Sequence, residues 1–189
     1  MFGWHKEDMD LYSINFLHVG HPKFWYSVDL RDNSKFEAYV RSKFPDEQKE
    51  CKEFIRHKNT LIHPRNLIQQ GIRMRKATHY PGEFMISRAS AYHSGFNSGY
   101  NLAEAVNFAL PSWIEIGKNA GICECQDDSV KIDMMQFEEN LKTVIQNDYC
   151  IPEWVKIGGG RKDMKCMARR MMTRALPSKN KRSSQSHED

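Results

Sequence analysis

A metal-binding pattern stands at the very start of the chain, where one residue separates His5 from Glu7. On a β-strand, residues i and i+2 point to the same face, so this imidazole and this carboxylate would lie side by side. Two histidines and one carboxylate on one face of a metal ion leave three positions open, as in non-haem Fe(II) oxygenases. His93, at the end of a predicted strand, is the best candidate for the third ligand. The pair alone is a weak signal, and the alternative is an ordinary surface contact between His5 and Glu7.

Two polar residues in apolar strands suggest a site for an organic acid. Iron oxygenases with this triad mostly need 2-oxoglutarate, whose distal carboxylate is bound by a buried cation and a neutral donor. Lys23 in KFWYSV and Asn15 in SINFL offer these groups. A lysine in an apolar strand is unfavourable without a counter-ion. The alternatives are a lysine at a strand edge that reaches solvent and a core asparagine with satisfied hydrogen bonds.

A second candidate metal site consists of three cysteines and one histidine, namely Cys51, His57, Cys123 and Cys125. A Cys-x-Cys loop and a Cys-x5-His segment together give Cys3His, a common structural zinc set. The two halves lie far apart in the chain, so free thiols with a surface histidine remain the alternative. The odd total of five cysteines favours metal binding or free thiols over disulfides. Cys150 and Cys166 have no evident partner.

The elements that must position these residues are strands interrupted by helices. They are expected, in chain order, as strands within 9–30 around a turn at 20–22, helices at 34–44, 46–57 and 66–70, strands at 84–93 and 100–110 around the turn SGFNSG, and helices at 112–119 and 132–148. Ser34 and Glu37 fit a capping box for the first helix. Since strands and helices do not alternate regularly, the fold class is mainly β with helical insertions.

Composition and charge restrict the partners. The 189 residues suffice for one domain with a substantial core, and no apolar run reaches the length of a membrane span. Charged residues near the start exclude a signal peptide, which favours the cytosol or the nucleus. Residues 156–189 hold ten basic and three acidic side chains. We expect a solvated basic tail, with weak DNA contact as the alternative.

Three segments in fixed order carry a resemblance to a known family: MFGWHKEDMDLYSINFLHVGHPKFWY, RHKNTLIHP and GEFMISRASAYHSGFNSGYNLAEAVNFA. Residues 1–141 resemble the JmjC (Jumonji) histone lysine demethylases, and most of all the group with paired JmjN and JmjC domains. The resemblance implies a partial double-stranded β-helix, a jelly-roll or cupin-like fold, with a structural zinc site. The implied organisation is a catalytic core at 1–110, a helical segment with zinc ligands at 111–155 and a basic, largely disordered tail at 156–189.

The resemblance also implies a role for individual residues. The matched positions are His5, Glu7 and His93 for iron, Asn15, Lys23, Trp25 and Phe2 for 2-oxoglutarate, Lys58 and Asn107 for the substrate, and Cys51, His57, Cys123 and Cys125 for zinc. Ala105 and Val106 stand where relatives differ near the methyl groups, so the preferred lysine and methylation state do not transfer.

The implied reaction is demethylation of methylated lysine in the histone H3 tail, on chromatin in the nucleus. Fe(II) and 2-oxoglutarate activate O2, giving succinate and CO2, and the hydroxylated N-methyl group leaves as formaldehyde. A first alternative is a catalytically inactive, truncated JmjC chromatin protein. A second is a JmjC protein hydroxylase with another substrate, against which the Cys3His set argues. A third is a DNA-binding protein that acts through the tail.

Relatives carry sequence before the matched part that no segment of this chain resembles. It includes the JmjN segment, the first part of the JmjC domain, a tyrosine that contacts 2-oxoglutarate and residues of the methyl-lysine cage. A double-stranded β-helix without its early strands exposes sheet edges. The chain made alone is therefore expected to be unstable or inactive.

Overall fold

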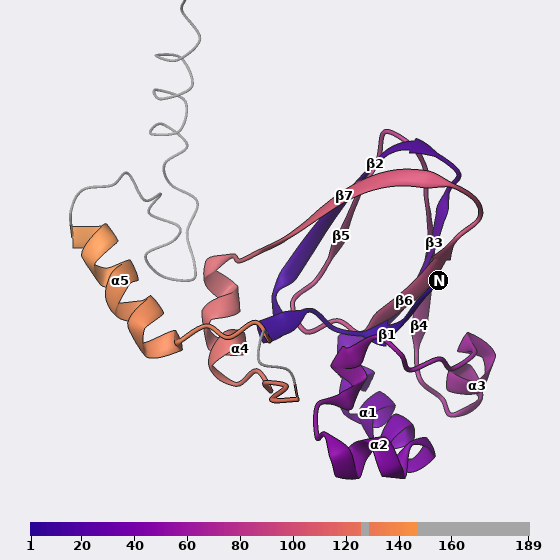
Figure 1. Ribbon diagram of the computed structural model, residues 1–189, viewed down its shortest axis with the longest axis horizontal. Helices are drawn as coiled ribbons and strands as arrows, with labels where there is room; N and C mark the ends of the chain where they lie inside the picture. Colours follow the sequence, from indigo (N-terminus) through magenta and orange to yellow (C-terminus); the bar gives the residue numbers. More distant parts are fainter. Residues whose placement is uncertain (126–128, 147–189) are drawn as a thin grey trace, which may run out of the picture. The chain divides into compact units, whose positions relative to one another are not determined.

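The computed structural model describes residues 1–125 and 129–146 of the 189-residue chain. The chain divides into two compact units, Met1–Phe137 and Glu138–Asp189. The first unit contains every strand of the described residues (Figure 1). The predicted tail at 156–189, together with Cys150 and Cys166, lies outside the described residues. The division at residues 110 and 155 stays a prediction.

The described elements are strands grouped around helical insertions. The strands are β1 (Phe2–His5), β2 (Tyr12–Gly20), β3 (Lys23–Val28), β4 (Met74–His79), β5 (Phe84–Ser87), β6 (His93–Asn97) and β7 (Asn101–Phe108). The α-helices are α1 (Asn33–Lys43), α2 (Pro45–Glu50), α3 (Pro64–Gln69), α4 (Ile114–Lys118) and α5 (Met134–Gln146). The 3-10 helices are η1 (Asp8–Asp10), η2 (Leu30–Asp32), η3 (Phe54–His57) and η4 (Pro111–Trp113). None of these helices is long and apolar enough to span a membrane.

The strands form two antiparallel sheets between which the chain crosses repeatedly. One sheet has the order β1-β6-β3-β4 and the other β5-β2-β7. The two sheets face each other within the first unit (Figure 1). The turn between β2 and β3 requires Gly20, whose φ is +104° and whose missing Cβ would lie 2.4 Å from the carbonyl oxygen of Tyr100. This arrangement confirms the expected mainly β fold with helical insertions.

Alternation along the strands separates a packed face of the four-stranded sheet from a face that lines a cavity. Val28 and Tyr26 belong to the larger apolar core, where α1, η3 and α3 contribute residues such as Phe36. Trp25, one residue away on β3, lines the cavity instead. The helical insertion therefore covers one face of this sheet and leaves the other for a site.

The predicted helices are confirmed in position but not in every detail. Helix α1 matches the expected 34–44, yet the capping box is wrong, since Asp32 occupies the N-cap without a side-chain cap. The Asp32 carboxylate instead accepts hydrogen bonds from the side chain of Arg73. The single helix expected at 46–57 is also wrong. It breaks into α2 and η3 because the backbone is extended at Cys51, with φ −147° and ψ 123°.

The strand expected at 84–93 is two strands in different sheets. Strand β5 ends at Ser87, and β6 begins only at His93. Between them Ser90 adopts a left-handed conformation with φ +62°, which lets the chain pass from one sheet to the other. The turn expected in SGFNSG starts later than predicted, because β6 continues to Asn97.

Candidate active site

Three side chains with metal-ligating atoms meet between the sheets. The ligand atoms of His5, Glu7 and His93 all lie within 4.8 Å of one another. Strands β1 and β6 are antiparallel neighbours in which His5 stands opposite His93. The expectation that His5 and Glu7 lie on one strand is wrong. Strand β1 ends at His5, and Glu7 lies just beyond it. Its Oε1 nevertheless reaches to 3.4 Å from Nε2 of His93.

Backbone carbonyls orient both imidazoles. Nδ1 of His5 lies 2.9 Å from the carbonyl oxygen of Gly3, and Nδ1 of His93 lies 3.0 Å from that of Ala91. A carbonyl only accepts, so each Nδ1 carries a hydrogen and Nε2 is the ring nitrogen left to contact a metal. Such a carbonyl partner is the usual second contact of a metal-binding histidine. The residues present thus fit a divalent metal ion.

The electrostatics of the triad favour a bound cation near neutral pH. His5 and His93 are only 5% and 4% exposed, which excludes the alternative of a surface pair. Burial, assisted by His93, lowers the pKa of His5 from 6.5 to about 4, so its imidazole is neutral. Burial acts to raise the pKa of Glu7, but hydrogen bonding and charge from His93, with a hydrogen bond from Asn107, lower it to about 2. His5 therefore presents a neutral nitrogen and Glu7 a carboxylate.

Acidification is expected to destabilise the iron-free protein. Between pH 6.5 and about 4 the unfolded chain binds a proton that buried His5 does not, so stability falls as the pH falls through this range. The lowered pKa of Glu7 adds stability that is present above 4.5 and lost toward about 2. In the parent chain, the free energy of unfolding should fall by about 3 kcal/mol between pH 6.5 and pH 4 because of His5. The variant His5→Gln should not show this decrease in urea unfolding curves recorded without added iron. An equally steep pH dependence in the variant would contradict this.

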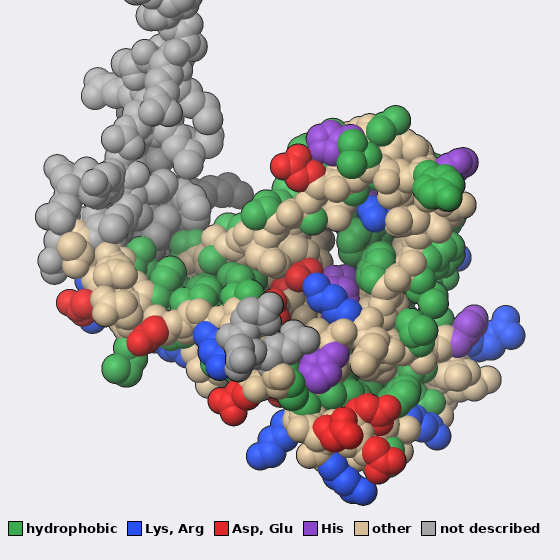
Figure 2. Space-filling model, viewed as in Figure 1, with side chains coloured by type: hydrophobic (Ala, Val, Ile, Leu, Met, Phe, Trp, Pro, Cys, Tyr) green, Lys and Arg blue, Asp and Glu red, His purple; other side chains and the backbone are tan. Residues whose placement is uncertain are grey.

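A cavity of about 320 Å³ contains the triad and collects the other predicted residues. Its lining consists of Phe2, His5, Glu7, Ser13, Asn15, Lys23, Trp25, Lys58, His93, Ala105, Val106 and Asn107. The face of the molecule drawn in Figure 2 is hollowed, and basic, acidic and histidine side chains lie in the hollow. All nine residues expected at the iron, 2-oxoglutarate and substrate positions thus line one space.

Unsatisfied polar atoms mark the part of the cavity formed by β2 and β3. Oδ1 of Asn15 and Nε1 of Trp25 are buried and have no hydrogen-bond partner among the described residues. The alternative of a satisfied core amide is therefore wrong for Asn15. Lys23 donates a hydrogen bond of 2.8 Å to Oδ1 of Asn97, and burial lowers its pKa. A cation and two unpaired polar groups beside the triad fit a carboxylic acid ligand.

The predicted substrate residues lie on the remaining walls. Lys58 has a left-handed backbone with φ +62°, and its carbonyl accepts a hydrogen bond from the backbone of Gly3. A Cβ at Gly3 would lie 2.4 Å from that oxygen, so this contact requires glycine. Asn107 donates a hydrogen bond to the carbonyl of Tyr12. Ser13 is the lining residue that the sequence reasoning missed, although it stands two positions from Asn15 on the same strand face.

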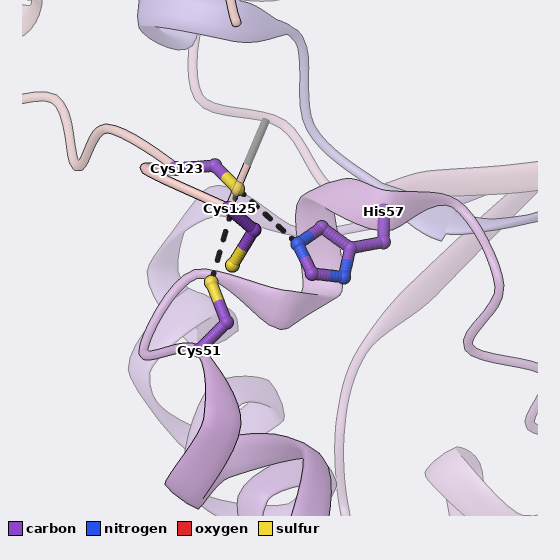
Figure 3. Close-up of side chains that lie close together, drawn as sticks. All are labelled: Cys51, His57, Cys123 and Cys125. Carbon is purple, nitrogen blue, oxygen red and sulfur yellow. Dashed lines mark hydrogen bonds between the residues drawn. The ribbon is translucent and has the colours of Figure 1, made fainter. Parts of the chain in front are cut away.

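The second cluster brings together side chains from two distant segments (Figure 3). Ligand atoms of Cys51, His57, Cys123 and Cys125 lie within 4.8 Å of one another. Sγ of Cys51 is 3.8 Å from Sγ of Cys123, which in turn is 3.2 Å from Nε2 of His57. Zn–S bonds of about 2.3 Å in a tetrahedron separate two sulfurs by about 3.8 Å. The cluster therefore fits a zinc ion.

The thiols of this cluster are crowded in the absence of a cation. Burial, together with hydrogen bonds and charge from Cys125 and Cys123, raises the pKa of Cys51 to about 12. A metal cation reverses this effect, because a coordinating thiol is deprotonated outright. Cys51 is buried and both Cys51 and Cys123 pack against the larger core. The site would thus join the segment after α2 to the segment after α4.

Comparison with known proteins adds independent information. The model of the JmjC domain, described as a hydroxylase, matches residues 1–108. Three similar proteins align with 141 residues of this chain, which is 75% of its length. Over these residues the chain is 47% identical to human probable lysine-specific demethylase 4F, 46% identical to rat lysine-specific demethylase 4D and 48% identical to mouse lysine-specific demethylase 4B. The aligned part spans 22%, 28% and 13% of those relatives. With a family model that covers more than half of its length, the chain belongs to the JmjC-domain hydroxylases.

Proposed function

We propose that this chain carries the active site of an Fe(II)- and 2-oxoglutarate-dependent dioxygenase that demethylates methylated lysine of histone H3. The observation that carries the proposal is the meeting of His5, Glu7 and His93 with the polar groups of Asn15 and Lys23 in one cavity. The names of similar proteins support lysine demethylation, and chromatin in the nucleus is the corresponding location. Zinc at the Cys3His cluster would have a structural role.

In this proposal the triad holds the metal on one side and leaves positions open toward the cavity. Lys23 and Asn15 bind the distal carboxylate of 2-oxoglutarate, while Trp25 and Phe2 pack around it. The Phe2 and Trp25 rings contact each other, with centroids 5.1 Å apart, and so form one apolar wall. Iron and 2-oxoglutarate, when bound, supply the oxidation of the N-methyl group by O2. The protein contributes binding, orientation and exclusion of water.

The substrate would approach over the walls formed by Lys58 and Asn107. Asn107 also hydrogen-bonds Glu7, which links the substrate wall to the metal ligand. Ala105 and Val106 are small neighbours on the same strand and leave room beside the triad. This wall is where the choice among lysines and methylation states would be made.

The direct test is turnover of trimethylated histone H3 peptides with Fe(II), 2-oxoglutarate and ascorbate. Loss of methyl mass from the peptide, with equal amounts of formaldehyde and succinate, is the expected result. Succinate without peptide demethylation would favour a hydroxylase with another substrate. Metal and 2-oxoglutarate binding without any turnover would favour the inactive chromatin protein.

Replacing Lys23 with alanine is expected to weaken 2-oxoglutarate binding about 10- to 100-fold, because a hydrogen bond to a charged group is lost. The KM for 2-oxoglutarate should rise accordingly, while Mn(II) affinity without 2-oxoglutarate stays as in the parent chain. Lys76→Ala is the matched control, since Lys76 is exposed on the neighbouring strand β4. Equal KM values in the two variants would show that Lys23 does not bind the cofactor.

A further inference from the structure

The turn that follows Glu7 has an unfavourable backbone conformation. Met9 and Asp10 have φ values of +52° and +53°, although neither is glycine. Both are buried, at 3% and 5% exposure. Residues in this region persist only where the surrounding structure holds them. The position of Glu7 therefore depends on what holds this turn.

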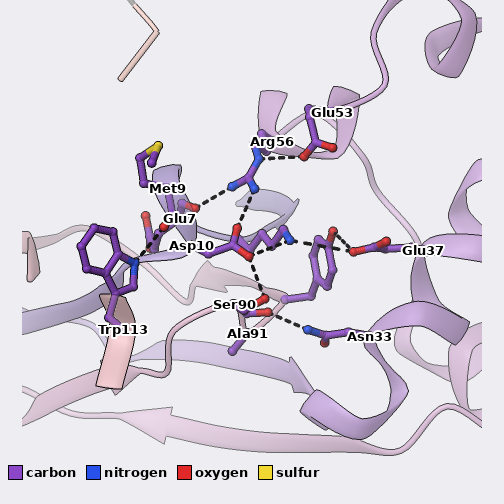
Figure 4. A network of polar contacts seen from close by, with 12 residues as sticks. Glu7, Met9, Asp10, Asn33, Glu37, Glu53, Arg56, Ser90, Ala91 and Trp113 are labelled. Atoms are coloured by element: carbon purple, nitrogen blue, oxygen red, sulfur yellow. Dashed lines mark hydrogen bonds and ion pairs between the residues drawn. The ribbon is translucent and has the colours of Figure 1, made fainter. Parts of the chain in front are cut away.

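Arg56, the third residue of η3, holds the turn with all three sides of its guanidinium (Figure 4). Nη1 donates a hydrogen bond of 2.7 Å to the backbone carbonyl of Glu7 itself. Nη2 forms a 2.6 Å ion pair with Oδ1 of Asp10. Nε donates to Oε2 of Glu53 at 2.9 Å. The Arg56 side chain is only 4% exposed, so these contacts are shielded from water.

The opposite side of the turn is tied to the segment that leads to His93. Oδ2 of Asp10 accepts hydrogen bonds from Ser90, at 2.9 Å, and from Lys6, at 3.0 Å. The backbone carbonyl of Asp10 accepts a further bond from the amide of Ser90. Nε1 of Trp113 donates to the carbonyl of Met9. One buried carboxylate thus connects the turn of Glu7 with the approach to His93.

We propose that Arg56 is a positioning residue, which through the carbonyl of Glu7 and the carboxylate of Asp10 fixes the Glu7 side chain beside His5 and His93. The inference rests on the proposed function, because it assigns Arg56 a role toward the metal that the triad would bind. This role is separate from those of the cavity-lining residues, because Arg56 itself does not line the cavity.

The geometry requires arginine and not merely a positive charge. Three acceptors, on Glu7, Asp10 and Glu53, surround the guanidinium in different directions. A planar guanidinium presents its donors in a rigid fork, whereas a lysine ammonium is a compact charge on a flexible stem. Lysine at this position keeps the charge opposite Asp10 but cannot hold all three groups.

The test measures Mn(II) affinity by calorimetry on the full chain, since Mn(II) is redox-inert here and prefers nitrogen and oxygen ligands over thiolates. Arg56→Lys and Asp10→Asn are expected to bind Mn(II) about 10- to 100-fold more weakly, as is typical when an outer partner of a metal ligand is lost. Glu53→Ala, at a partly exposed position, is the milder variant and should weaken binding several-fold while the fold is retained.

Arg73→Lys is the matched control, because Arg73 forms a comparable fork on Asp32 outside the cavity. Thermal melts of the metal-free variants and their zinc content separate folding defects from loss of positioning. Parent-like Mn(II) affinity in Arg56→Lys and Glu53→Ala would overturn the proposal, even if the melting temperature fell. If the parent chain itself bound no Mn(II), the proposed metal centre would fail and this inference with it.

Discussion

Replacing His93 with alanine is expected to abolish Fe(II) binding in the cavity and all turnover that depends on it. The triad offers three protein ligands, and the variant leaves only His5 and Glu7. Loss of a direct ligand should exceed the 10- to 100-fold effect typical of an outer partner, so we expect an affinity more than about 100-fold weaker. Anaerobic calorimetry with Fe(II) and formaldehyde release measure the two effects.

The control for this variant is His21→Ala, because His21 lies exposed in the turn between β2 and β3. It removes the same number of atoms and should leave iron affinity and turnover unchanged. Zinc content should stay the same in both variants, since the two clusters share no residue. Iron affinity in His93→Ala equal to that of the control would refute the assignment of His93 as a ligand.

Sequence reasoning predicts the triad because part of it is local. His5 and Glu7 are two residues apart, and their types restrict the chemistry before any fold is known. Alternation along β3 also predicts that Lys23 and Trp25 share a face, as both line the cavity. The sequence singles out His93 by its place at the end of a predicted strand and by the family resemblance, but the register that sets it opposite His5 requires the sheet itself.

The contacts that hold the triad in place leave no local signal. Arg56 and Asp10 are 46 positions apart, and a buried ion pair cannot be inferred from two charged residues at such a distance. The left-handed backbone conformation at Met9 cannot be predicted from the sequence, because the position is not a glycine. The break at Cys51 has the same origin, because its extended backbone belongs to a cluster completed by Cys123 and Cys125.

The strand boundary before His93 shows why periodicity alone was insufficient. The segment 84–93 has the composition of one strand, yet its two ends pair in different sheets. The crossing is made at Ser90, which the carboxylate of Asp10 binds. A tertiary contact thus overrides the local strand preference and moves His93 from the end of one strand to the start of another.

Removal of zinc is expected to produce the largest loss of stability. A metal that binds only the folded chain stabilises it by about 4 kcal/mol when present at 1,000 times its dissociation constant. Cys51 belongs to the larger core, Cys123 packs against it, and the two residues are 72 positions apart in the chain. A strong zinc chelator, or Cys123→Ser, should therefore lower the free energy of unfolding by at least about 4 kcal/mol, measured by urea unfolding with and without added zinc.

The active site is expected to respond to this loss, because the segment that contains His57, a proposed zinc ligand, also holds β1. Backbone bonds join Gly3 to Lys58 and Trp4 to Thr60, and β1 ends at His5. Chelation should thus weaken Mn(II) binding as well as stability, and zinc affinity should fall with falling pH because protons compete for the thiolates. Cys166→Ser is the matched control for Cys123→Ser. Identical unfolding curves with and without chelator, in a chain that copurifies with no zinc, would mean that the cluster is four unliganded side chains.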